Sequence, residues 1–356
     1  MIIINGRFLK QRITGVQRFA YEITKELIAN DSNVKIIVPK SYKDTLPKET
    51  ENLFKEYFIF EGAGEGLVWE QFVLPLCLKQ NMLLLNFCNS APILWRNKLT
   101  CVHDMSYKSN PQWFSRKVRL YYSVLIPSIL RTSKYIITVS EFAKAEIFKY
   151  VKGIGTNTIE VIYNACAEVF RNDSFPDNKN FNSKILLFVG SIEPRKNLDN
   201  LLAAFAKIED PEARLIIVGK QNTKMFNHVN LKLDSDNRIL WKHSCKDEEL
   251  KELYISAKAL VNPSLYEGFG VPLIEAASNA CLLLLSKIPV FIEVANGDAC
   301  FFDPYDTNNI ADTLKGLLNL SPVEANKMAQ KAYLNIAKSF SWKNSADKLY
   351  KLIKGN

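Results

Sequence analysis

The chain has 356 residues, of which 47% are hydrophobic and 23% are charged. This composition is typical of a globular protein and excludes a disordered or fibrous one, while the length predicts two domains with a cleft between them. The 46 Lys and Arg residues outnumber the 37 Asp and Glu residues, giving a net charge of +9, and roughly +7 of this excess lies in residues 1–180. Such a bias suits nucleic acid or an acidic membrane surface as a partner, and it equally suits a solvated basic surface.

The seven cysteines form no CxxC pair and mostly lie in apolar stretches, so we expect them to be reduced. Met1 runs directly into apolar Ile2–Ile4, without the charged start of a secretion signal. The most apolar later run, residues 280–292, is interrupted by Lys287 and Pro289 and is too short to span a bilayer. We therefore expect a cytoplasmic protein that associates with a membrane at most peripherally.

The first half of the chain alternates short apolar runs with amphipathic segments, which is typical of a parallel sheet covered by helices. The expected helix covers residues 16–29, where apolar residues recur at helical spacing. These elements define an N-terminal domain over residues 1–171. The expected strands are residues 1–4, 35–38, 83–86, 99–102, 135–139 and 159–163.

Residues 172–183 are polar and rich in turn formers, which predicts a linker. A second α/β series follows over residues 184–341, so the predicted fold class is α/β, with two doubly wound, Rossmann-like domains facing across a cleft. Ligands of such sheets bind at the carboxyl ends of the strands. The expected elements are a helix over 197–208 and strands over 184–189, 214–218, 238–241, 259–261, 282–285 and 299–302.

The clearest motif is a strand, glycine loop and helix over residues 259–278. Gly268 and Gly270 allow a ligand to approach the backbone closely, and Pro272 suits the start of a helix whose free amides then face the loop. Glu267 is placed to accept hydrogen bonds from sugar hydroxyls, and Glu275 to bind a ribose diol. An ordinary loop with an acid near the helix start gives the same pattern.

A second strand-to-helix junction, residues 190–197, places Arg195 and Lys196 at the carboxyl end of a strand. A departing nucleoside diphosphate accumulates negative charge, which two preorganised cations can stabilise. A capped helix start with two solvated bases fits the same residues.

The N-terminal half carries two weaker motifs. Gly15, in the turn 12–17 after the first strand, permits close approach of a ligand to the backbone. His103 and Asp104 follow another strand, where His103 suits a sugar hydroxyl and Asp104 suits the sugar ring or an incoming group, although an isolated His at a strand end is more often structural.

A metal site is not expected. Asp234-Ser235-Asp236 has the DxD form of metal-dependent transferases of another fold, but its place before a strand favours a turn. The histidines at 103, 228 and 243 lack the spacing of a zinc site. The expected cofactor is therefore none.

Together these motifs resemble glycosyltransferase family 4, the retaining GT-B enzymes also called glycosyltransferase group 1. The resemblance covers nearly the whole chain, and in that family a helix corresponding to about 342–356 crosses back to the N-terminal domain. Two positions depart from it: Ser191 stands where many relatives have Arg, and Asn164-Ala165 replaces Asn-Gly. The residues that carry the resemblance are 14–18, 102–104, 138–142, 161–164, 193–197, the pair Glu267 and Glu275, and 340–342.

The resemblance implies a role for each motif. Glu267 would hold the transferred sugar, Glu275 the ribose, and Arg195 and Lys196 the diphosphate, with catalysis assigned to Glu267, His103, Lys196 and Arg195. The acceptor would meet Thr14, Gly15 and Asp104. The further donor-binding residues would be Gly15, Ser191, Asp247, Gly268, Phe269, Gly270 and Val271, and a base contact is expected in the loop 242–247.

The expected activity is retaining, metal-independent hexosyl transfer, best matched by mannose from GDP-mannose, onto a glycan or lipid-linked oligosaccharide of a surface polysaccharide such as lipopolysaccharide or capsule. Alternatives are a UDP- or dTDP-sugar donor, or a GT-B epimerase or phosphorylase. A non-enzyme alternative is a silent partner that binds a nucleotide sugar or nucleic acid, although no nucleic acid partner is expected. Basic and aromatic residues cluster over 115–122, which fits peripheral contact with an anionic membrane. The same residues fit a helix that packs against the rest of the protein.

Overall fold

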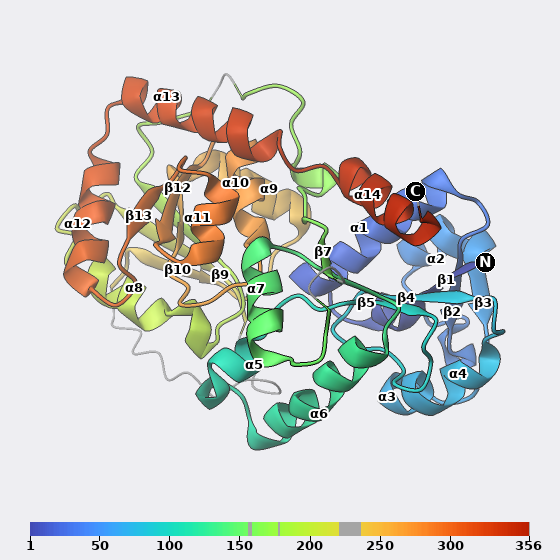
Figure 1. The fold of residues 1–356 in the computed structure, drawn as a ribbon. Helices are drawn as coiled ribbons and strands as arrows, with labels where there is room; N and C mark the ends of the chain where they lie inside the picture. The colour runs from blue at the N-terminus through green and yellow to red at the C-terminus, as the bar shows by residue number, and fades with distance from the viewer. Residues whose placement is uncertain (156–158, 177–178, 221–235, 356) are drawn as a thin grey trace. The chain divides into compact units, whose positions relative to one another are not determined.

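The computed structural model describes the chain apart from residues 156–158, 177–178, 221–235 and 356. It divides into two compact units, each an α/β structure (Figure 1). The first unit comprises Met1–Lys108, Leu120–Asn164 and Trp342–Asn356, and the second comprises Ser109–Arg119 and Ala165–Ser341.

The first unit is built on a parallel sheet whose described strands are in the order β3-β2-β1-β4-β5-β6-β7. Six of these strands lie where the apolar runs predicted them. The edge strand β3 was not predicted, because its side chains are only half-buried and it has three residues. The strands are β1 (Ile2–Asn5), β2 (Lys35–Val38), β3 (Phe58–Phe60), β4 (Leu83–Asn86), β5 (Lys98–Cys101), β6 (Tyr135–Thr138) and β7 (Ile159–Val161).

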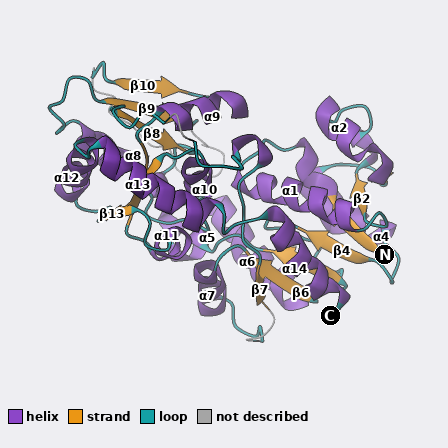
Figure 2. Cartoon of the chain, turned by 90° about the horizontal axis from the view of Figure 1, so that it is seen from above, coloured by secondary structure: helices purple, strands orange, loops and turns teal. Residues whose placement is uncertain are grey.

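Helices lie against this sheet (Figure 2). In α1 the residues Phe19, Ile23 and Leu27 are fully buried, as their helical spacing predicts. The helices of residues 1–164 are η1 (Gly6–Lys10), α1 (Gly15–Asn30), η2 (Lys40–Tyr42), α2 (Lys48–Phe54), η3 (Lys55–Tyr57), α3 (Gly66–Val68), the π-helix η4 (Trp69–Val73), α4 (Leu74–Cys77), α5 (Ser106–Ser109), η5 (Pro111–Trp113), α6 (Arg116–Thr132) and α7 (Glu141–Tyr150).

The last helix, α14 (Trp342–Lys354), belongs to the first unit. It lies against α1 (Figure 1), where the rings of Trp342 and Phe19 meet edge to face at 5.8 Å. Tyr350 donates a hydrogen bond to Asp31 at 3.0 Å at the other end of the contact. The chain thus returns to its N-terminal unit, as the resemblance implies.

The second unit repeats the design with a parallel sheet in the order β10-β9-β8-β11-β12-β13 among its described strands. Every predicted strand is present, with ends shifted by a residue or so. The strands are β8 (Ile185–Val189), β9 (Arg214–Val218), β10 (Ile239–Lys242), β11 (Ala259–Asn262), β12 (Leu282–Ser286) and β13 (Cys300–Phe302).

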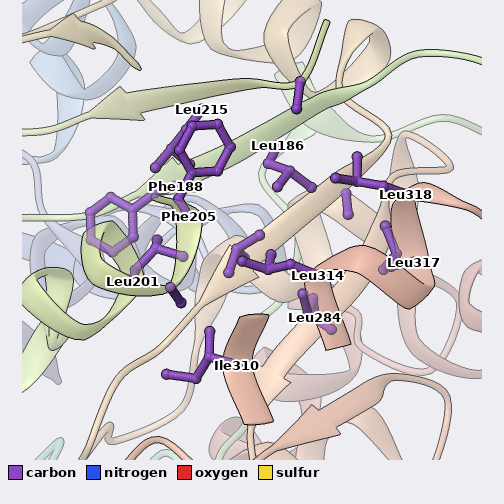
Figure 3. Packing of buried hydrophobic residues seen from close by; sticks show 14 of the residues in the cluster. Leu186, Phe188, Leu201, Phe205, Leu215, Leu284, Ile310, Leu314, Leu317 and Leu318 are labelled. Atoms are coloured by element: carbon purple, nitrogen blue, oxygen red, sulfur yellow. The ribbon is translucent and has the colours of Figure 1, made fainter. Parts of the chain in front are cut away.

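The core of the second unit fills the space between this sheet and helices α8 (Leu198–Phe205) and α12 (Thr307–Leu318) (Figure 3). Phe205 and Leu314 are fully buried there against strand residues such as Leu215 and Leu284. The remaining helices of the unit are η6 (Glu168–Phe170), η7 (Pro194–Lys196), α9 (Asp247–Ser256), α10 (Val271–Ser278), α11 (Pro289–Ala295), α13 (Pro322–Ala332) and the π-helix η8 (Tyr333–Ala337).

The predicted linker, residues 172–183, is part of the second unit, and contacts divide the chain at Asn164 and Ala165 instead. The Lys179 ammonium donates to the carbonyls of Tyr254, Ile255 and Ala257 at 2.6–2.7 Å. Asn172 bonds Ser278 and Asn279. The polar side chains that suggested a linker serve as tertiary hydrogen-bond partners.

Both sheets reverse their strand order once, the first between β1 and β4 and the second between β8 and β11. Loops diverge at such a point and leave a crevice at the carboxyl ends of the two strands, which is where open parallel sheets bind ligands. We therefore expect ligand-binding residues in the segments that follow these four strands.

Candidate active site

Three charged side chains meet at the β8/β11 crevice of the second unit. The carboxylate of Glu267 accepts from Arg195 Nη1 on Oε2 at 2.5 Å and pairs with the Lys196 ammonium through Oε1. Ser264 Oγ lies 2.8 Å from Oε1. The two motifs that sequence analysis assigned separately to diphosphate and sugar therefore form one cluster.

The cluster keeps Glu267 ionised although its carboxyl is buried. Burial acts to raise the pKa of Glu267, but the charges of Arg195 and Lys196, with hydrogen bonds from Lys196 and Ser264, outweigh it and lower the pKa to about 2. Lys196 is itself buried, with 7% of its surface exposed. A fixed negative charge is thus held between two fixed positive ones.

Backbone contacts hold the two loops of the cluster together. Leu265 N–H donates to the carbonyl of Arg195 at 2.8 Å, and Arg195 Nη1 donates to the carbonyl of Tyr266 at 3.2 Å. Asn197, at φ 55° between η7 and α8, donates to the carbonyls of Pro263 and Pro304. Glu193 pairs with Arg195 Nε at 2.5 Å, which fixes the guanidinium from its other side.

The glycine loop ends where α10 begins. Gly270 is the N-cap of α10, with φ 107°, and a Cβ there would lie 2.9 Å from Phe291 Cε1. Only glycine fits this position without strain. The loop residues Gly268 and Phe269 precede it, and the amides of Val271 and its successors open the helix toward the crevice, as the motif predicts.

Glu275 lies one turn further along α10 and is buried. Its Oε2 accepts a hydrogen bond from the hydroxyl of Tyr254 at 2.9 Å. Tyr254 is fully buried in α9, and burial together with the charge of Glu275 raises the pKa of its hydroxyl, which therefore stays protonated. This partner was not predicted, because an apolar position of an amphipathic helix carries no signal of a polar contact.

Two other predicted donor residues of the second unit follow strands of its sheet, Ser191 after β8 and Asp247 after β10. Ser191 follows Gly190 after β8, and a Cβ at Gly190 would lie 3.4 Å from Lys196 Cε, so this backbone runs directly past the ammonium. Asp247 opens α9 after β10 and is not among the groups that contact Glu267.

In the first unit, Thr14 and Gly15 form the start of α1. Thr14 is the N-cap and its hydroxyl contacts the side chain of Gln17, and Gly15 is the first helical residue. The first amides of α1 therefore lie at the carboxyl end of the sheet, after β1.

His103 and Asp104 follow β5 in the first unit. His103 is buried, and its Nε2 donates to the carbonyl of Phe87 at 2.8 Å, so Nδ1 is left as the acceptor of the neutral ring. Burial lowers the pKa of His103 and keeps the ring neutral. Asp104 Oδ1 accepts from Ser106 N at 2.9 Å and Ser106 Oγ at 2.6 Å, so it is bonded to the first residue of α5.

Within the described ranges, no group of three or more His, Cys, Asp and Glu side chains is arranged to hold a metal ion. Of the DxD sequence, Asp234 and Ser235 lie outside the described residues, as does His228. Asp236 pairs with Arg238 at 2.7 Å, just before β10.

Known proteins resemble the chain in both sequence and fold. Residues 169–335 match the family described as Glycosyl transferases group 1. O-antigen chain mannosyltransferase RfbU of Salmonella typhimurium is 30% identical over 263 residues, 71% of each chain, and O-antigen chain mannosyltransferase B of Escherichia coli is 25% identical over 96% of each. Sucrose-phosphate synthase from Thermosynechococcus elongatus superposes with a TM-score of 0.74 at 17% identity, covering 99% of this chain and 98% of that one.

The extent of these matches confirms the family and the fold that the motifs predicted. The glycine loop and both members of the carboxylate pair fall within the matched residues, and the two parallel sheets are those of a GT-B enzyme. The chain belongs to the group 1 glycosyltransferases, with the GT-B fold.

Proposed function

We propose that the protein is a retaining mannosyltransferase that uses GDP-mannose to extend a glycan or lipid-linked oligosaccharide of a surface polysaccharide. The observation that carries the proposal is the cluster of Glu267 with Arg195 and Lys196 at the β8/β11 crevice. The sugar and the pathway are supported by relatives named as O-antigen mannosyltransferases.

In the proposed complex the donor replaces part of the cluster. The diphosphate binds to Arg195 and Lys196. These side chains already place positive charge where the leaving group becomes most negative. Glu267, relieved of part of its ion pairing, accepts hydrogen bonds from the sugar, and Glu275 holds the ribose with its second oxygen on Tyr254. Ser191, Asp247 and the backbone of Gly268–Val271 complete the donor site.

The first unit supplies the acceptor side. Amides at the start of α1, near Thr14 and Gly15, face a phosphate or the acceptor, and Asp104 orients the incoming hydroxyl. His103 accepts a hydrogen bond from the transferred sugar on Nδ1, because Nε2 is committed to Phe87.

We propose front-face displacement with retention, in which the departing phosphate takes the proton of the acceptor hydroxyl. Lys196 and Arg195 then receive the charge of the diphosphate without a metal ion. A retaining glycosidase route needs two carboxyls flanking one bond at about 5 Å, and Glu275 is instead assigned to the ribose.

The donor is tested by thermal unfolding with GDP-, UDP- and dTDP-sugars, because a ligand of the native state raises its stability. GDP-mannose is expected to raise the unfolding temperature most. Greater stabilisation by a UDP- or dTDP-sugar would reassign the donor. Conversion of the donor at full rate without an acceptor would favour an epimerase or phosphorylase, and tight RNA binding without any nucleotide-sugar effect would favour a non-enzyme.

We further propose that the first unit docks on an anionic membrane from the cytoplasmic side. Over residues 71–108 and 120–140 the first unit holds six basic residues and a single acid, Asp104. Val68, Phe72 and Leu76 follow one another at spacing four along α3, η4 and α4, and all three are exposed, Leu76 to 85%. Exposed Leu94 and Val124 add to the same unit, and this apolar and basic combination suits a lipid headgroup region.

Co-sedimentation with phosphatidylglycerol vesicles at low salt tests the docking. The pair Phe72→Ser and Leu76→Ser is expected to abolish pelleting, while Val323→Ser, an equally exposed residue of α13, leaves it unchanged. No pelleting of the wild type, or none lost in the double variant, would contradict the proposal. None of the described helices is long and apolar enough to cross the bilayer itself.

A further inference from the structure

The second unit contains an open groove that is separate from the donor residues. The groove has a volume of about 570 Å³ and lies between residues 179–182 and helix α13. This volume falls within the range of clefts that bind small molecules, roughly 300–1,000 Å³. One wall of the groove belongs to the polar segment that the sequence suggested as a linker.

The groove lies at the amino edge of the sheet, opposite the cluster around Glu267. Segment 179–182 leads into β8, and the ammonium of its lysine donates to carbonyls over residues 254–257, just before β11. Lys258, the residue before β11, donates to the carbonyl of Leu320, two residues before α13. The strands are parallel, so the five residues of β8, about 13–17 Å, separate the groove from that cluster.

The outer face of α13 forms one wall of the groove. Four residues of this helix line the groove at the spacing of a single helical face. They are Val323, Asn326, Lys327 and Gln330. The opposite face of α13 packs inward, because Ala325, Ala329 and Ala332 are all buried. The helix is therefore held in place by one face and presents the other to a ligand.

Segment 179–182 forms the other wall. Phe181 is buried in the core of the unit, whereas Asn180 and Asn182 are exposed and line the groove. The backbone N–H of Asn182 donates to Asn180 Oδ1 at 3.0 Å, which fixes the turn. Together with the three bonds of Lys179 to carbonyls, these contacts preform the wall without a ligand.

The side chains of the groove suit a neutral ligand with hydroxyl groups. An amide both donates and accepts hydrogen bonds, as a hydroxyl does. None of the described residues that line the groove is acidic, so a cation finds no countercharge. The amides are those of Asn180, Asn182, Asn326 and Gln330.

An anion fits the groove less well than a neutral ligand. The start of a helix is where an anion commonly binds, but at α13 the Glu324 carboxylate already accepts from the Ser321 N–H at 3.1 Å. Pro322 has no N–H to offer. Pro322 and the largely exposed Val323 instead give the groove an apolar surface, which suits the C–H face of a sugar ring.

We propose that this groove binds a neutral oligosaccharide, a stretch of the glycan under extension, at a site apart from the reaction centre. Asn326 and Gln330 contact its hydroxyls from α13 and Asn182 contacts them from the other wall, while Val323 packs against a ring. The inference rests on the proposed function for the acceptor being a glycan. A second binding site on the same polymer raises the effective concentration of its growing end.

The test is isothermal titration of the full chain with three neutral glycans: α-linked mannotetraose, isomaltotetraose and chitotetraose. The wild type is expected to bind at least one of them. The double variant Asn326→Ala and Gln330→Ala is expected to bind that glycan about tenfold more weakly, because two hydrogen bonds are lost. Alanine favours a helix, so the variant is expected to fold, which circular dichroism checks.

Two controls separate the groove from the reaction centre. Gln80→Ala removes an exposed glutamine of the first unit and is expected to bind the glycan as the wild type does. Saturating GDP is expected to leave glycan binding unchanged, because the cluster lies at the opposite edge of the sheet. Unchanged affinity in the double variant, competition by GDP, or a wild type that binds none of the glycans would overturn the inference.

A heparin-derived tetrasaccharide tests for an anionic ligand. Tighter binding of this probe than of every neutral glycan, lost in Lys327→Ala but kept in Lys315→Ala, an exposed lysine of α12, would also overturn the inference. Thermal unfolding with GDP-mannose tests the proposed donor separately. Glycan binding in the groove without stabilisation by GDP-mannose counts against that donor alone, and stabilisation without glycan binding counts against the groove alone.

Discussion

The ammonium of Lys196 and the carboxylate of Glu267 form an ion pair within the second unit, and each side chain is less than a tenth exposed. Removing two charges from water is costly, and a buried pair stabilises a fold only where further bonds satisfy it. Arg195 and Ser264 supply those bonds. A cluster assembled before any ligand arrives needs no rearrangement of its charges when the leaving group forms, which is the condition for strong electrostatic catalysis.

Lys196→Ala is expected to lower kcat by about 100-fold to 1000-fold, as for loss of one preorganised donor at a site of developing charge. Steady-state transfer from GDP-mannose measures the effect, with circular dichroism to confirm folding. Lys184→Ala serves as the control, because Lys184 precedes the same strand β8 at its opposite end and pairs with half-buried Asp210 and exposed Glu212. Turnover at the wild-type rate in Lys196→Ala would refute the assigned role.

The lowered pKa of Glu267 predicts a pH dependence of stability. The pKa of Glu267 is about 2 in the folded protein, whereas an ordinary glutamate has a pKa near 4.3. The ionised carboxylate therefore stabilises the folded state fully at pH values above about 4.3. That contribution, about 3 kcal/mol at neutral pH, is lost as pH falls toward 2. Glu267→Gln lacks it throughout.

Urea unfolding from pH 7 to pH 2 measures this difference. The gap in unfolding free energy between wild type and Glu267→Gln is expected to stay constant down to about pH 4.5 and then to narrow. A gap that is the same at pH 2.5 as at pH 7 would show that Glu267 has an ordinary pKa. Glu324→Gln, an exposed capping residue of α13, is expected to give a far smaller gap.

Local sequence patterns predicted most of the fold because the strands are short, mostly apolar runs, which is typical of a parallel sheet buried on both faces. β2 and β4 begin and end where the runs do. The segment 172–183 was predicted wrongly, because its polarity is satisfied by long-range partners: Lys179 bonds carbonyls at the end of α9, which no local pattern reports.

The candidate site was likewise predicted only in part from the sequence. Gly270 and the acids on either side of it were found from sequence, since a positive φ and a helix start leave a local signature. Tyr254 was missed because its partner Glu275 lies 21 residues away. The donor and acceptor roles assigned to the site residues stay predictions.

Tyr254→Phe is expected to weaken nucleotide binding about tenfold, because Glu275 then loses the bond that orients its carboxylate. If Glu275 binds the ribose, the wild type prefers GDP to 2′-deoxy-GDP, and the variant loses much of that preference. Isothermal titration of both nucleotides measures it. Tyr333→Phe removes a similar hydroxyl, bonded to the Asn172 carbonyl at 2.9 Å, and is expected to bind both as the wild type does. If Tyr254→Phe keeps the full preference for GDP over 2′-deoxy-GDP, the assignment of Glu275 to the ribose is wrong.

Gly270→Ala tests the start of α10. An alanine at this position has to adopt φ 107°, and its Cβ lies 2.9 Å from Phe291 Cε1. The variant is therefore expected to lose about 1–3 kcal/mol of unfolding free energy. We also expect the strain to displace the amides that face the donor. Gly316→Ala is the matched control, since a Cβ within α12 meets nothing within 4 Å and alanine favours a helix by about 0.5–1 kcal/mol. Urea unfolding measures both variants, and the strain account fails if the two changes have the same sign. Donor affinity, measured by thermal shift with GDP-mannose, is expected to fall in Gly270→Ala alone, because only that variant alters the backbone beside Glu267.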